Sequence, residues 1–202
     1  MNAKVPPPPE FGEPCPIERS EAALALLARR RSSSAALLTG PPPSREELQD
    51  LLRLAARVPD HGKLNPWRFV ILQGAAKAAL VEELRRLAAF QPSPDKAEAA
   101  LAKLANPPLS VLVVSTPKPG KQPVWEQELS AGAVCTTMLI AAQAMGYGAN
   151  WITDWYAFDP KALDVLGIGE GEKVAGFIHL GASPEPPLER VRPDLDALVT
   201  WA

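Results

Sequence analysis

Four short polar segments hold most of the side chains that could do chemistry, and each lies where a helix or strand is expected to begin or end. In chain order they contain Arg30, Arg31 and Ser32; Arg57 and His61; Trp151, Ile152 and Thr153; and Arg190 and Arg192. The planar fork of arginine binds phosphate and carboxylate groups through paired hydrogen bonds. Polar groups dispersed between long apolar segments are typical of a protein that holds a large cofactor with chemistry of its own.

The second of these segments lies in a loop between two prolines. Pro59 is expected to end a leucine-rich helix, because proline lacks a backbone donor, and Pro66 favours extended geometry in the residue before it. We therefore expect a stiff polar loop around His61, which is one of only two histidines in the chain. Stiff loops between helices and strands often carry functional groups. A tight connection with a solvated histidine is the simpler alternative.

Common fingerprints of other chemistry are missing from the sequence. It contains no GxGxxG, GxxxxGK[ST], HExxH or GxSxG pattern, which disfavours the usual dinucleotide, nucleotide, zinc-protease and α/β-hydrolase sites. A Ser-His-Asp site would have to use His61, and the neighbouring Asp60 is expected to point elsewhere. Cys15 and Cys135 lie far apart without a metal-ligand pattern, so we expect neither a metal site nor a disulfide.

Apolar periodicity and start and stop signals predict more helices than strands. Helices are expected at 20–31, 124–145 and 160–166. A further helix is expected from the Ser44–Glu47 capping box to the proline-bounded loop, and residues 75–105 are expected to form two helices that are separated at 91–94. The expected strands are 69–72, 109–115, 149–153 and 174–180. His179 alternates with apolar neighbours and is expected to be a satisfied sheet histidine, and residues 32–34 are expected to be plain loop.

The small residues of the 124–145 helix and the arginines that end the first helix each have a simple structural explanation. Gly132 would let another helix or a flat ring approach closely, and helix packing is the commoner use. Cations such as Arg30 and Arg31 also suit the carboxyl end of a helix, where the backbone dipole is negative.

Length and composition favour one globular domain preceded by a proline-rich leader. The chain has 202 residues, 47% hydrophobic and 22% charged, with a formal net charge of −2. This charge gives no electrostatic case for nucleic acid. We expect a disordered leader at 1–19, with Pro6–Pro9 favouring extended polyproline geometry, and a single domain at 20–202. No signal peptide or membrane-spanning run is apparent, so a cytoplasmic location is expected.

The ordered motifs resemble the compact branch of the FMN-dependent nitroreductase family. Arg30-Arg31-Ser32 resembles the family's RRS at the end of the first helix, and residues 57–67 resemble its R-x-P-D-H…P-W segment. Residues 125–132 resemble its W-E-Q-E-x-S-A-G helix start, and residues 146–151 its glycine-rich turn into a strand. Each motif is weak alone, whereas their order and spacing over roughly residues 21 to 202 are specific.

The resemblance implies an α+β fold, a three-layer αβα sandwich with a mixed, mainly antiparallel sheet, and a homodimer with FMN at the interface. Arg30, Arg31 and Ser32 would then come from one subunit, and Arg57 and His61 from the other. Trp151, Ile152 and Thr153 would border the flavin ring, and Arg190 or Arg192 would meet the phosphate. One cation that larger relatives place two residues after the motif serine is replaced by Ser34.

The resemblance also implies the chemistry. NADH or NADPH would pass hydride to flavin N5, and a nitroaromatic, quinone or other conjugated acceptor would follow in a ping-pong cycle. No protein side chain would be the catalytic group, and Arg30 is the first candidate to tune the flavin potential. Three alternatives stay open: a flavin enzyme for one dedicated metabolite, a flavin-binding protein without turnover, and an interaction module that uses the proline leader.

Overall fold

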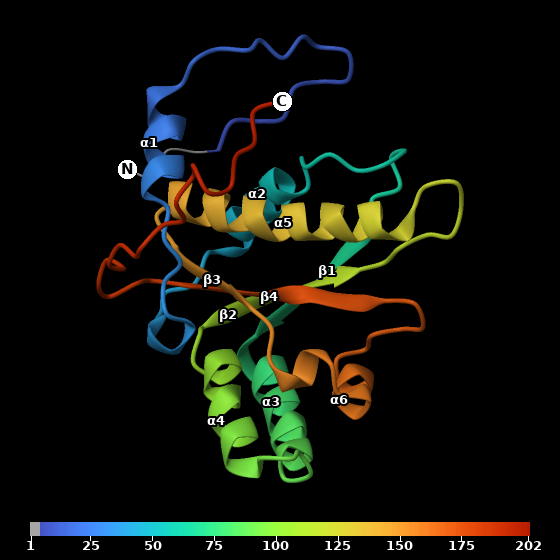
Figure 1. Cartoon of the computed structure of the whole chain (residues 1–202). Helices are drawn as coiled ribbons and strands as arrows, with labels where there is room; N and C mark the ends of the chain where they lie inside the picture. Colours follow the sequence, from blue (N-terminus) through green and yellow to red (C-terminus); the bar gives the residue numbers. More distant parts are fainter. Residues whose placement is uncertain (1–4) are drawn as a thin grey trace.

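A central antiparallel sheet carries helices on both of its faces in the computed structural model, which describes residues 5–202 (Figure 1). The strand order is β1-β2-β4-β3, and all three pairings are antiparallel. The strands are β1 (Trp67–Gln73), β2 (Leu109–Ser115), β3 (Gly148–Ile152) and β4 (Lys173–Gly181). β2 is buried along its whole length, which explains its continuous apolar run.

The helices begin and end at the signals that the sequence provides. Ser44 and Glu47 form a reciprocal capping box, and Ser20 accepts a hydrogen bond from the backbone of Ala23 at the start of the first helix. Gly146, at φ 85°, follows the longest helix. The helices are α1 (Glu21–Arg29), α2 (Arg45–Ala55), α3 (Gly74–Ala88), α4 (Pro94–Ala105), α5 (Val124–Ala144) and α6 (Pro160–Val165).

The sheet separates two hydrophobic cores. On one face α2 and α5 pack on alternate residues of the strands, with Leu51, Met138 and Ile178 among the fully buried side chains. On the other face α3, α4 and α6 pack around Leu112 and Phe177. Figure 1 shows α5 running across one side of the sheet, with α3, α4 and α6 on the opposite side. The three layers follow from this two-sided burial.

The expected α+β sandwich with a mainly antiparallel sheet is confirmed, and none of the described strands pairs in parallel. The predicted elements occur within about two residues of their expected bounds at most ends. Two short 3-10 turns, at Ala35–Leu37 and Trp155–Ala157, were not predicted. A bridge between Thr39 and Ala182, which ties the chain after α1 to the end of β4, was also missed because nothing local specifies it.

The chain before α1 and after β4 differs from this packed body. Residues 5–19 form no helix or strand, while residues 1–4 of the predicted leader lie outside the described residues. In the tail, Leu195, Leu198, Val199 and Trp201 are exposed, so the rest of the chain from residue 5 onwards does not cover them. No helix in residues 5–202 combines the length and the hydropathy that a membrane crossing needs.

Candidate functional site

The end of α1 and the C-terminal tail lie against each other. Arg31 Nε donates to the carbonyl of Leu188 at 2.8 Å, and Arg192 Nη2 donates to the carbonyl of Arg30 at 3.3 Å. Among the described residues, the Arg30 guanidinium reaches only the hydroxyl of Ser32, at 3.5 Å, which leaves most of its fork open. The structure therefore brings together the first and the last of the predicted arginine segments, although they are about 160 residues apart in sequence.

The segment after Arg31 is fixed to β3, which corrects the expectation of a plain loop. Ser33 N donates to the carbonyl of Ala149 at 2.9 Å, and the side-chain amide of Asn150 donates to the carbonyl of Ser33. Ser33 is buried as a result. These contacts place Arg30–Ser32 beside the strand that carries Trp151 and Ile152 and is followed by Thr153.

Trp151 lies against two glycines, and one of them, Gly176, provides the room for its ring. Its Nε1 donates to the carbonyl of Ala175 at 3.1 Å. A Cβ at Gly176 would lie 2.0 Å from that same nitrogen, and a Cβ at Gly132 would lie 3.9 Å from the ring. The close approach of a flat ring to Gly132 is thus made by Trp151 of the same chain, and only a glycine at position 176 leaves room for the indole.

The loop between Pro59 and Pro66 is attached to the first turns of α5. His61 Nδ1 contacts the carboxylate of Glu126, and because an ionised carboxylate only accepts, the imidazole is the donor. Asp60 accepts a hydrogen bond from Asn65 N at 2.7 Å and so closes the loop on itself. As expected, Asp60 does not pair with His61. Arg57, at the start of this loop, is exposed.

Residues of the W-E-Q-E-x-S-A-G motif hold these loops, although the sequence assigned them no role. The Ser130 hydroxyl accepts from Trp67 Nε1 at 3.1 Å and donates to the carbonyl of Pro59 at 2.9 Å. The buried amide of Gln127 bonds both the N–H and the carbonyl of Lys118. The motif itself was the available signal, because adjacent polar residues in an otherwise apolar helix need partners.

Within one chain, the predicted residues form two separate groups at opposite ends of α5. His61 contacts Glu126 in the first turn, whereas Arg31 and Ser33 line a cavity of about 230 Å³ together with Gln143 near the last turn. Seventeen residues of α-helix rise about 26 Å. Trp151 lies between the two groups, beside Gly132. A single chain therefore does not assemble all the predicted residues around one ligand.

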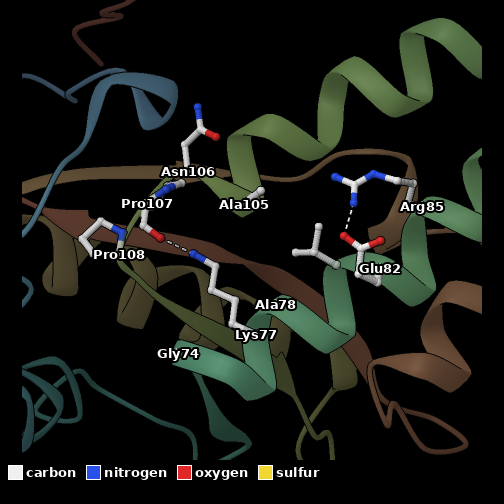
Figure 2. Close-up of a pocket in the computed structure, with 10 residues that line it drawn as sticks. Gly74, Lys77, Ala78, Glu82, Arg85, Ala105, Asn106, Pro107 and Pro108 are labelled. Atoms are coloured by element: carbon white, nitrogen blue, oxygen red, sulfur yellow. Dashed lines mark hydrogen bonds and ion pairs between the residues drawn. The ribbon is translucent and has the colours of Figure 1, made fainter.

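A second cavity, of about 280 Å³, lies on the opposite face of the sheet between α3 and α4 (Figure 2). Lys77 lies at its floor, almost fully buried, and donates to the carbonyl of Pro107. Burial lowers the pKa of Lys77 to about 8. Arg85 at the rim is already paired with Glu82 and Glu98. The basic groups of this cavity are thus engaged in contacts within the chain.

His179, expected to be a satisfied sheet histidine, has a partner on one side only. Its Nδ1 lies 2.8 Å from the hydroxyl of Ser110 on the neighbouring strand, whereas the buried Nε2 has no hydrogen-bond partner among the described residues. Burial, with a further contribution from the charge of Lys77, lowers the pKa of His179 to about 3. The ring is therefore neutral at physiological pH and belongs to the core.

Comparison with known proteins gives one consistent relationship. A relative named "Putative NAD(P)H nitroreductase YdjA" from Escherichia coli K12 is 36% identical over 138 residues, which cover 67% of this chain and 75% of the relative. A nitroreductase-like family protein from Bacillus cereus superposes with a TM-score of 0.79 at 19% identity, over 93% of this chain and 99% of the other.

A further solved structure is described as a nitroreductase with bound FMN, from Bacteroides fragilis. It superposes with a TM-score of 0.67 at 23% identity, over 91% of this chain and all of the other. The sequence model described as "Nitroreductase family" matches residues 27–182 of the chain, from within α1 to the end of β4. On this match and on the 36% identity, the chain belongs to the nitroreductase family.

Proposed function

We propose that two copies of this chain form a cytoplasmic FMN-dependent oxidoreductase, which takes hydride from NADH or NADPH. Its acceptor would be a nitroaromatic, a quinone or another conjugated compound. The observation that carries the proposal is the separation of Arg30–Ser32 from Arg57 and His61 along α5. In a two-fold symmetric dimer the same surface of both chains forms the interface. The two α5 helices can then run antiparallel to each other, so that the start of one α5 lies beside the end of the other.

The surface of α5 supports such an arrangement. Its outward residues include Trp125 and Leu129, which are 62% and 60% exposed, and α1 adds Leu24 and Leu27 on the same side of the sheet. Figure 1 shows α1 and the tail next to α5 on the side away from the sheet. An apolar face of this kind on a helix of a small domain is typical of a subunit interface.

The residues at the end of α1 fit the phosphate of FMN. Arg30 has most of its fork unused, Ser32 offers a hydroxyl, and the Arg190 guanidinium makes no hydrogen bond or ion pair with the described residues. Two open guanidinium groups and a hydroxyl are a suitable donor set for a phosphate dianion. Arg30 and Ser32 would bind the phosphate, and Arg190 or Arg192 would supply the second positive charge that neutralises the dianion.

The remaining residues would position and enclose the ring system. Trp151, held by Gly176 and the Ala175 carbonyl, offers a fixed apolar surface between the two polar groups. His61 and Arg57 of the second subunit would approach from the opposite end, with His61 oriented by Glu126. When bound, FMN supplies the hydride chemistry, so that these side chains need only bind, orient and shield the cofactor.

The visible absorption spectrum of the purified protein tests the proposal. We expect flavin bands, or their appearance after incubation with FMN and removal of excess, and rapid anaerobic bleaching on addition of NADH or NADPH. Riboflavin, which lacks the phosphate, is the matched control and should bind more weakly. A chain that takes up no FMN contradicts the proposal, and one that binds FMN without bleaching is a flavin-binding protein rather than an enzyme.

A further inference from the structure

One carboxylate oxygen of Glu189, in the C-terminal tail, lies close to both Arg31 and Arg192, which the sequence assigned to the cofactor. Glu189 Oε1 lies 3.0 Å from Arg192 Nη2 and 3.1 Å from Arg192 Nε, and 3.6 Å from Arg31 Nε. The backbone N–H of Arg190 donates to the same oxygen at 2.7 Å. These contacts lower the pKa of Glu189, the Arg190 N–H most strongly, and so keep the carboxylate charged.

Arg31 and Arg192 also donate hydrogen bonds to backbone carbonyls, each to the segment opposite its own. Arg31 donates to the carbonyl of Leu188, in the tail, and Arg192 donates to the carbonyl of Arg30, at the end of α1. Each arginine thus links one segment's backbone to the charge of Glu189. Arg30 and Arg190, which alternate with them in sequence, have no such partner among the described residues.

We propose that Glu189 is a positioning residue, which clamps the tail onto the end of α1 through Arg31 and Arg192 and leaves Arg30 and Arg190 for the phosphate. The proposal rests on the function proposed above. It divides the four arginines into two that hold the backbone and two that bind the anion. It also assigns a favourable role to Glu189, although the negative charge of a carboxylate by itself repels a nearby phosphate.

The sign of one substitution separates the clamp from its alternative. If Glu189 only adds negative charge, or occupies the place of the phosphate, Glu189→Gln should strengthen anion binding. If Glu189 is the clamp, Glu189→Gln should weaken FMN binding by about 3- to 10-fold, because the tail must be ordered at the expense of binding. Inorganic phosphate, used as a competitor of FMN, should lose affinity in the same direction.

Glu185→Gln is the matched control. Glu185 lies in the same tail, and its side chain makes no hydrogen bond or ion pair with the described residues. Removing this charge should leave FMN affinity unchanged or raise it by at most about 2-fold, since exposed charges act weakly through solvent and salt. Combining Glu189→Gln with Arg192→Gln should weaken FMN binding by less than the product of the two single effects, because the Glu189–Arg192 contact that both changes remove is lost only once.

Hydrogen exchange of the protein without FMN provides a readout independent of flavin. The backbone amides of residues 188–192, which include the Arg190 N–H bonded to Glu189, should exchange faster in Glu189→Gln than in the wild type, and at the wild-type rate in Glu185→Gln. Equal exchange in all three proteins, or FMN affinity that is unchanged or tighter in Glu189→Gln, overturns the clamp. If the wild type binds no FMN, the proposed function fails, while the exchange experiment still decides whether Glu189 holds the tail.

Discussion

The hydroxyl of Ser130 connects both ends of the His61 loop to α5. It accepts a hydrogen bond from Trp67 Nε1 at 3.1 Å and donates one to the carbonyl of Pro59 at 2.9 Å. Since Ser130 is 6% exposed, water replaces neither contact easily. The loop that carries His61 is therefore placed by a residue that is about 70 positions later in the chain.

Replacing Ser130 by alanine should destabilise the protein by about 1–3 kcal/mol, because it leaves a donor and an acceptor without partners. Urea denaturation followed by circular dichroism measures this. Thr136→Ala is the control, since Thr136 lies exposed on the same helix and its hydroxyl bonds, within residues 5–202, only the carbonyl of Gly132. An equal effect of the two changes would show that the bridge contributes nothing.

Replacing Gly176 by alanine should cost more than about 2 kcal/mol. The added Cβ would lie 2.0 Å from Trp151 Nε1, and φ at this position is 157°, which side chains rarely adopt. Denaturation and tryptophan fluorescence report the loss of stability and the displaced indole. Gly132→Ala is the control, because its Cβ would make only ordinary contact with the same ring.

The double variant Gly176→Ala with Trp151→Ala separates the two causes. Removing the indole should restore the part of the lost stability that comes from the clash between the new Cβ and Trp151. The part that comes from the backbone conformation at position 176 should stay lost. If Gly176→Ala is equally costly in both backgrounds, the glycine serves the backbone alone and Trp151 is positioned by other contacts.

Acid should destabilise the fold through His179. Burial holds its folded pKa at about 3, below the ordinary value of 6.5, so the unfolded chain binds more protons between these values. The contribution to stability is fully present above pH 6.5 and is lost as the pH falls towards 3. Between pH 7 and 4.5, His179 should account for about 2–3 kcal/mol of lost stability.

His179→Gln tests this contribution by urea denaturation at both pH values. Glutamine keeps a polar partner for Ser110 but does not titrate, so the variant should lose less stability between pH 7 and 4.5 than the wild type. Carboxylates such as Glu172, whose pKa the hydrogen bond from Arg68 lowers to about 2, act equally in both proteins. Parallel pH dependence in the two proteins would refute the assignment.

Mixing two defective chains tests the shared site. Arg30→Ala and Arg57→Ala should each lose FMN affinity, since each removes one side of both sites in a homodimer. After co-expression, a heterodimer has one site with both changes and one site with neither, so about half of the flavin sites in the heterodimer should be intact. Flavin content of the heterodimer, isolated with two affinity tags, measures this. No recovery in a verified heterodimer would place both arginines in the same subunit's site.

Local sequence signals determined most of the fold. The capping box at Ser44, the prolines around the His61 loop and the continuous apolar run of β2 each specify an element through nearby residues alone. Their predicted bounds agree with the structure because caps, proline geometry and burial periodicity act over a few residues. The order of the motifs, in turn, was sufficient to indicate the family.

Only the tertiary structure decided which distant groups meet. Arg68, for which the sequence offered no role, forms an ion pair with Glu172 at 2.6 Å, and Glu126 rather than Asp60 holds His61. Arg31 and Arg192 converge on Glu189 although nothing in the local pattern distinguishes them from Arg30 and Arg190. Such pairings depend on how elements pack across the sheet and on where the tail returns, whereas sequence spacing constrains only neighbours along one helix or strand.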